Sequence, residues 1–186
     1  MIVQSAKKAV LVYGASSSHI DPQYIEAART LGELVARRGY PLISGGGRGG
    51  LMAAAIEGAH SEGGYTIGVL PQFMLDRDWQ HPLLDEVVAT DSMHSRKQTM
   101  AARSCCAIAM PGGIGTFEEL MEIVTWRQLK LYSNPVVILN TAGYYDPLLE
   151  MLSKATSLGF MREGTGLLYE VASTPAEALE LALPRQ

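Results

Sequence analysis

Short apolar runs alternate with longer helical patterns along almost the whole chain, and this alternation limits the fold most. Strands are predicted at residues 9–14, 41–44, 65–71, 85–91, 105–111, 135–140 and 169–174. Helices are predicted at residues 22–39, 50–63, 93–104, 115–130, 146–159 and 175–184. Strands that alternate with helices form βαβ units, which build a parallel sheet covered on both faces. We therefore predict an α/β fold, a doubly wound parallel sheet, as a single domain over residues 1–186.

Caps and breaks support these boundaries. Asp21 precedes Pro22, an N-cap and first-turn pair, and Asp146-Pro147 repeats the signal. Residues 71–82 are polar, aromatic and bounded by prolines, so we expect a loop there. In open α/β sheets, ligands bind beyond the carboxyl ends of the strands, so any site is expected at that edge.

Composition narrows the class of protein. Of 186 residues, 47% are hydrophobic and 18% are charged, as in a folded globular protein. The net charge of −4 gives no reason to expect a nucleic-acid partner, and no apolar run is long enough to suggest a membrane partner. The adjacent Cys105 and Cys106 suit neither a disulfide with each other nor a CxxC motif. We expect a cytoplasmic protein with two reduced cysteines.

A glycine-rich turn, GGGRGG at 45–50, follows the second predicted strand. It matches G-x-G-x-x-G between a strand and a helix, where backbone amides can hold a phosphate. The next strand ends in GVLP without the acid that a nicotinamide site needs, and Leu51 and Met52 replace the Lys and Ser/Thr of a Walker A loop. We favour phosphate or sugar binding at Gly45, Gly46 and Gly47, with Ser16 nearby, over glycines that serve only tight turns.

The segment MHSRK, residues 93–97, follows the fourth strand. Arg96 can grip a phosphate or carboxylate with two hydrogen bonds, and Lys97 offers a point charge. Taken alone, such a pair is more often a solvated helix face. His94 has no partner at metal-ligand spacing, so we expect no metal and no cofactor.

The segment PGGIGTFEE, residues 111–119, follows the fifth strand and joins a glycine turn to Glu118 and Glu119. A carboxylate beside a phosphate-binding turn can orient a water or stabilise a positive sugar. Neighbours on a helix point about 100° apart, so at most one of the two should face the site. A structural alternative stays open, in which Thr116 caps the helix and Glu119 completes a capping box.

These motifs resemble the LOG (Lonely Guy) family of cytokinin riboside 5′-monophosphate phosphoribohydrolases. PGGxGTxxE is matched by residues 111–119 and MHxRK by residues 93–97. YGASSS, GGGRGGLM and VTWRQL extend the similarity over nearly the whole chain. Ile114 and Arg48 stand where a Tyr and a small residue are common in the family.

The resemblance implies a Rossmann-like homodimer that hydrolyses the N-glycosidic bond of a nucleoside 5′-monophosphate, its small-molecule partner. It places the catalytic roles on Arg96 and Glu119. Substrate binding falls to Lys97, Thr125, Pro111, Gly112, Gly113, Ile114, Gly115 and Thr116, and an upstream family acid is matched to Asp78. A non-catalytic nucleotide sensor and a nucleotide-dependent oxidoreductase are the alternatives. The label lysine decarboxylase, common among relatives, has little support in a chain with five lysines.

Overall fold

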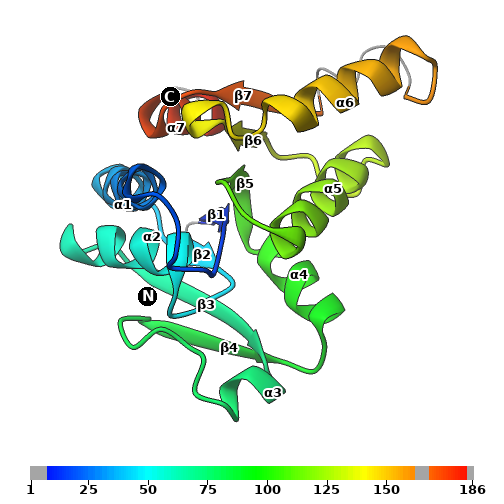
Figure 1. The fold of residues 1–186 in the computed structure, drawn as a ribbon. Coiled ribbons are helices and arrows are strands. Elements are labelled where there is room, and N and C mark those ends of the chain that lie inside the picture. The colour runs from blue at the N-terminus through cyan, green and yellow to red at the C-terminus, as the bar shows by residue number, and fades with distance from the viewer. Residues whose placement is uncertain (1–7, 162–167, 184–186) are drawn as a thin grey trace, which may run out of the picture.

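The computed structural model describes residues 8–161 and 168–183. Within them one sheet runs β4-β3-β2-β1-β5-β6-β7, and every adjacent pair is parallel (Figure 1). The strands are β1 (Ala9–Tyr13), β2 (Leu42–Ser44), β3 (Thr66–Pro71), β4 (Glu86–Thr90), β5 (Ser104–Ala109), β6 (Val136–Leu139) and β7 (Glu170–Ala172). All seven predicted strands are present, so the doubly wound parallel sheet is confirmed.

The helices lie where the sequence predicts them, with one addition. They are α1 (Pro22–Arg37), α2 (Gly50–Ser61), α3 (Gln72–Leu75), α4 (Met93–Ala102), α5 (Ile114–Gln128), α6 (Asp146–Ser157) and α7 (Pro175–Ala182), with a 3₁₀ turn η1 (Thr141–Gly143). The loop predicted for residues 71–82 was wrong in part, because it contains α3. This single turn is too short to show helical periodicity, and Gln72 Nε2 donates to Asp76 Oδ1 across it at 2.9 Å.

One cap was predicted correctly and the other was not. Asp21 caps α1, and its carboxylate accepts a hydrogen bond from the Gln23 amide at 3.0 Å. Asp146 is instead the first residue inside α6, and Tyr145 holds the cap position. The Asp146 carboxylate accepts from Asn140 Nδ2 at 2.7 Å, so it braces the preceding turn rather than capping the helix.

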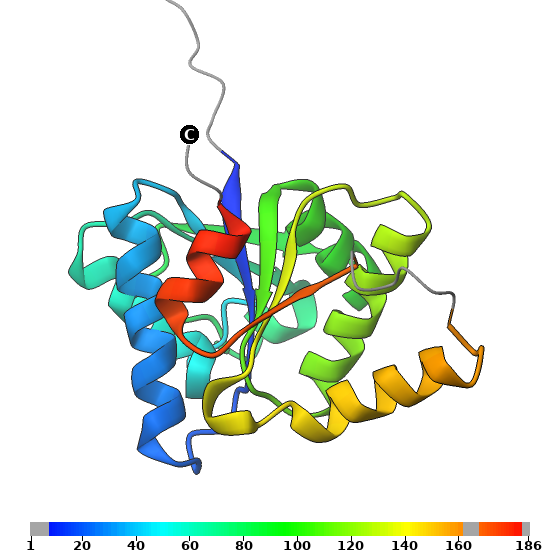
Figure 2. The same cartoon turned by 90° about the horizontal axis from the view of Figure 1, so that it is seen from above.

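Helices cover both faces of the sheet. One core joins α1, α2 and α7 to Val10 and Val12, and the other joins α4 and α5 to Leu11 and Tyr13 (Figures 1 and 2). Alternate residues of β1 therefore enter opposite cores, which explains why its sequence is a continuous apolar run. In the described part of the chain, no helix is long and apolar enough to cross a bilayer.

The order of the strands reverses beside β1. On one side of β1 the chain adds β2, β3 and β4 in order, and on the other side it later adds β5, β6 and β7. Loops that leave β1 and β5 therefore diverge and leave a crevice at their carboxyl ends, where ligands bind in such sheets.

Candidate active site

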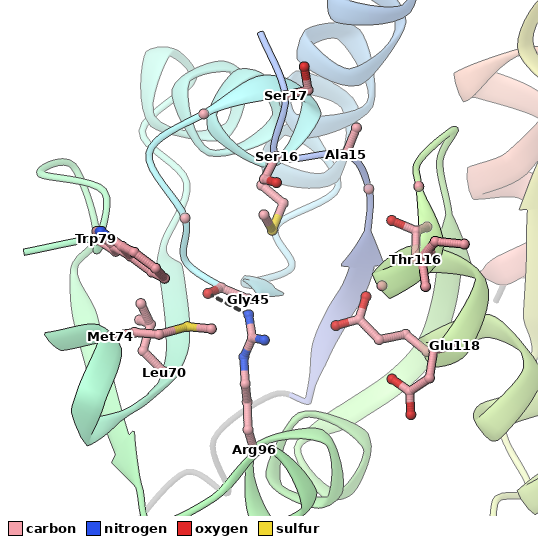
Figure 3. Close-up of a pocket in the computed structure, with 18 of the residues that line it drawn as sticks. Ala15, Ser16, Ser17, Gly45, Leu70, Met74, Trp79, Arg96, Thr116 and Glu118 are labelled. Carbon is pink, nitrogen blue, oxygen red and sulfur yellow. Dashed lines mark hydrogen bonds between the residues drawn. The ribbon is translucent and has the colours of Figure 1, made fainter. Parts of the chain in front are cut away.

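A pocket of about 610 Å³ lies at this reversal point (Figure 3). Its walls come from the turns after β1, β2 and β5, together with α4, which follows β4. The sequence analysis selected three of these strand ends, those of β2, β4 and β5, and expected Ser16, which follows β1, to lie near them. Residues far apart in the chain thus meet at one edge of the sheet.

Arg96 is buried and crosses the floor of the pocket from α4. Its Nε donates to the Val69 carbonyl at 2.8 Å and its Nη2 to the Gly45 carbonyl at 3.0 Å. Burial lowers the pKa of Arg96, and the nearby Glu119 carboxylate opposes that shift. Because two carbonyls fix the guanidinium, its charge is held in place before any ligand binds.

Glu119 lines the pocket from the second turn of α5. Burial raises the pKa of Glu119 to about 7, although the positive charges of Arg96 and Lys97 pull it down. A carboxylate with this pKa accepts a proton near neutral pH much more readily than an ordinary glutamate. The side chain therefore has the properties of a general base.

The N-terminus of α5 faces the same pocket. Gly113 is the N-cap, and no side chain caps the helix. Among the residues that the structure describes, the amides of Ile114, Gly115 and Thr116 have no hydrogen-bond acceptor. Free amides and the helix dipole together favour an anion here.

The capping-box alternative for Thr116 and Glu119 was wrong. Thr116 lies inside the first turn, and a Cβ on Gly112 would lie 2.1 Å from its Oγ1. Gly112 therefore makes room for the Thr116 side chain. Our expectation that only one of the two glutamates faces the pocket was also wrong, because Glu118 lines it too.

The glycine turn after β2 is built differently. The Leu51 and Met52 amides donate to the Ala15 carbonyl at 2.8 and 3.4 Å, and the Gly50 amide donates to Ser18 Oγ at 3.2 Å. The first amides of α2 are thus already hydrogen-bonded to the turn after β1. Gly45 and Gly47 still line the pocket, with Ser16.

Lys97 does not line the pocket. Its ammonium forms ion pairs with Glu118 and with Glu122, the latter at 3.1 Å. Burial lowers the pKa of Lys97, but these two hydrogen-bonded carboxylates outweigh it and raise the pKa overall. Lys97 therefore anchors Glu118 to α4, and its assignment to substrate stays a prediction.

The other predicted residues divide into two groups. Gly113, Ile114, Gly115 and Thr116 line the pocket, whereas Gly46, Pro111, Gly112, Asp78 and Thr125 do not. Thr125 donates to the Met121 carbonyl at 2.7 Å, and Asp78 is exposed with a φ of 54° in the turn after α3.

An apolar wall was missed by the sequence analysis. Leu70, Met74 and Trp79 lie on the side of the pocket away from Thr116, and Met52 and Met93 contribute to the lining (Figure 3). Arg48, noted only as a departure from the family pattern, also lines the pocket. Trp79, one of two aromatic residues in the segment 71–82 bounded by prolines, was the sequence signal for this wall.

Fold and site together define a Rossmann-like α/β protein with an anion-accepting helix end, a fixed arginine and a half-buried carboxylate in one pocket. Residues 52–182 match a family model described as "Possible lysine decarboxylase". The probable cytokinin riboside 5′-monophosphate phosphoribohydrolase LOGL2 of Oryza sativa subsp. japonica is 40% identical over 97% of this chain and 74% of its own. The Arabidopsis thaliana cytokinin riboside 5′-monophosphate phosphoribohydrolase LOG5 is 37% identical over 96% and 78%.

Solved structures share the fold. The molybdenum cofactor binding protein of Rippkaea orientalis superposes with a TM-score of 0.73 at 25% identity, covering 95% of this chain and 96% of its own. The molybdenum cofactor carrier protein of Chlamydomonas reinhardtii gives 0.68 at 29% identity, over 93% and 94%. The sequence matches above show that the chain belongs to the LOG family.

Proposed function

We propose that this protein hydrolyses the N-glycosidic bond of adenosine 5′-monophosphates, including N6-modified ones, and releases the free base and ribose 5-phosphate. The observation that carries the proposal is the presence of Glu119, with a pKa raised to about 7, in one pocket with Arg96 and the free amides of α5. The names of the LOG relatives agree with this reaction.

The polar and the apolar sides of the pocket bind different parts of the substrate. The α5 amides hold the 5′-phosphate, and the apolar wall of Leu70, Met74 and Trp79 holds the base. With the phosphate and the base held in this way, the ribose lies between them, near Glu119 and Arg96. The glycine turn after β2 shapes the pocket and positions Arg96 through the Gly45 carbonyl.

Glu119 acts on water and on the sugar. As the C1′–N bond lengthens, the ribosyl group gains positive charge, which the carboxylate stabilises. The oxygen of the water bonds to C1′ as the C1′–N bond breaks, while Glu119 accepts a proton of the water. The departing base takes up a proton from solvent, and Glu119 then returns its proton to solvent. Glycosidases use carboxylates against a similar transition state.

The test compares AMP with isopentenyladenosine monophosphate as substrates. Free base and ribose 5-phosphate should form in equal amounts, and Glu119→Gln should reduce turnover by at least about 10³-fold. Glu118→Gln is the matched control one residue away, and it should keep at least about a tenth of the activity because that acid pairs with Lys97. A fully active Glu119→Gln protein would refute the mechanism.

The second candidate is a protein that binds a nucleotide without turning it over. The names of the molybdenum cofactor carrier and binding proteins on this fold favour it. Thermal stabilisation by AMP with no release of base would support it. A decarboxylase is less well supported, because a Schiff base needs a neutral amine and the Lys97 ammonium is held by two carboxylates.

We also propose a homodimer in the cytoplasm. Large apolar side chains are exposed beyond α5, at Leu129 and Leu131, and on and after α6, at Met151, Leu158 and Phe160. Such surface is characteristic of a protein interface. Cys105 and Cys106 are thiols and not a disulfide in the described part of the chain, and reduced cysteines suit a reducing compartment. Light scattering after gel filtration should give twice the chain mass of 20.1 kDa.

A further inference from the structure

Trp79 is the one aromatic side chain among the described residues that line the pocket. We infer that its indole is the stacking platform for the base of the substrate, so that this site takes nucleotides through the planar base as well as through the phosphate. The inference rests on the proposed function and names the residue that recognises the base.

The position of Trp79 fits this role. The indole lies across the pocket from Thr116, which stands in the first turn of α5 (Figure 3). A nucleotide with its phosphate on the α5 amides extends its base toward that opposite wall. Leu70 and Met74 flank the indole there, so the surroundings of the base are apolar (Figure 3).

The backbone around Trp79 is fixed to the rest of the site. The Trp79 amide donates to the Met74 carbonyl at 3.1 Å, and the His81 amide donates to the Gly46 carbonyl at 2.8 Å. Gln80 forms an antiparallel bridge with Gly47. The segment that carries the indole is therefore tied directly to the glycine turn after β2.

The indole itself is held by Arg77. The guanidinium carbon lies 5.2 Å from the centroid of the ring, as in a cation–π contact. Asp78 lies between Arg77 and Trp79 and has a φ of 54°. This left-handed backbone conformation turns the chain so that Arg77 lies over the ring of Trp79. Trp79 lines the pocket and Arg77 does not. Trp79 is 44% exposed, so it retains surface for a base.

The chemistry of stacking sets the expected size of the effect. Cutting an aromatic side chain to alanine costs a base stacked on it about 1–3 kcal/mol of binding free energy, roughly a 5- to 160-fold loss of affinity. Stacking accepts any planar base, and it does nothing for ribose 5-phosphate. Comparing AMP with ribose 5-phosphate therefore separates the contribution of the base to binding from that of the phosphate.

Fluorescence tests the contact without requiring turnover. The chain has two tryptophans, and Trp126 lines a different cavity, so Trp126→Phe leaves Trp79 as the single reporter. In the Trp126→Phe/Glu119→Gln protein, AMP should quench the emission in a saturable manner, and ribose 5-phosphate should not. Equal quenching by both ligands, or none by AMP at concentrations that stabilise the protein thermally, would overturn the inference.

Kinetics provide the second test. Trp79→Ala and Trp79→Leu should both raise KM for AMP by roughly 5- to 160-fold, whereas Trp79→Phe should stay within about fivefold of wild type. If leucine replaces tryptophan without loss, the wall is merely apolar and the stacking role fails. If AMP quenches Trp79 but wild type releases no base, stacking stands and the hydrolase proposal fails. If wild type releases base but none of the three Trp79 substitutions changes KM for AMP, only the stacking role fails.

Discussion

The guanidinium of Arg96 occupies the space that a side chain at residue 45 would take. A Cβ built on Gly45 would lie 2.1 Å from Arg96 Nη2, which is also the atom that donates to the Gly45 carbonyl. The first glycine turn and the MHSRK motif, 51 residues apart, are therefore one structural unit. Gly45 serves the site by allowing the arginine to reach the backbone.

Gly45→Ala should push the guanidinium out of place. We expect a loss of about 1–3 kcal/mol in the free energy of unfolding, the usual cost of adding a methyl group to a packed site. The substitution should be nearly neutral in an Arg96→Ala background, because the clashing group is gone. Urea denaturation of the four proteins measures this coupling. An equal cost of Gly45→Ala in both backgrounds would show that the glycine has another role.

The sequence predicted the fold well because its signals are local. Strand runs such as 135–140 and the cap at Asp21 depend on neighbouring residues, and both are found. The motif positions of Arg96 and Glu119 were likewise readable from the chain, and both residues line the pocket.

Other parts of the site depend on tertiary contacts that no local pattern contains. The amides of the GGGRGG turn are taken by Ala15 and Ser18, and the Lys97 ammonium is taken by Glu118 and Glu122. Sequence alone showed these groups as free to bind an anion. Asp146 was misassigned for the same reason, since its partner Asn140 belongs to the turn before the helix.

The pH dependence of turnover should show Glu119 as the base. With a pKa raised to about 7 by burial, its active carboxylate form is lost in acid, so kcat should fall about tenfold per pH unit below that value. We use kcat because the phosphate of free substrate also titrates near pH 6. A bound phosphate adds negative charge, so the midpoint should lie at or above 7. A flat profile from pH 5 to 8 would contradict the assignment.

Lys97→Met should move that acidic limb to higher pH. The positive charge of Lys97 helps to lower the pKa of Glu119, so its removal raises the pKa further. The change also leaves Glu118 and Glu122 without their shared cation. KM measured on the alkaline plateau shows whether Lys97 also binds substrate. A large rise there would support the family assignment, and an unchanged limb would argue against the electrostatic link.

Glu119→Gln should gain stability at a pH where it loses activity. The pKa of the folded state, about 7, lies above the ordinary 4.5, so the folded protein binds the proton more tightly than the unfolded chain does. The free energy of unfolding therefore falls as pH rises from about 4.5 to 7, and wild type bears the cost of a partly desolvated charge at pH 8. The neutral glutamine removes this cost.

We expect Glu119→Gln to unfold with a free energy on the order of 1–3 kcal/mol above wild type at pH 8. The difference should vanish near pH 4, where both side chains are neutral. Glu118→Gln is the control, because that acid is exposed and bound to Lys97, so its removal should bring no gain. Urea denaturation at the two pH values gives the four comparisons. If Glu119→Gln were less stable than wild type at pH 8, the carboxylate would be holding the fold together, and its assignment as a buried base would be wrong.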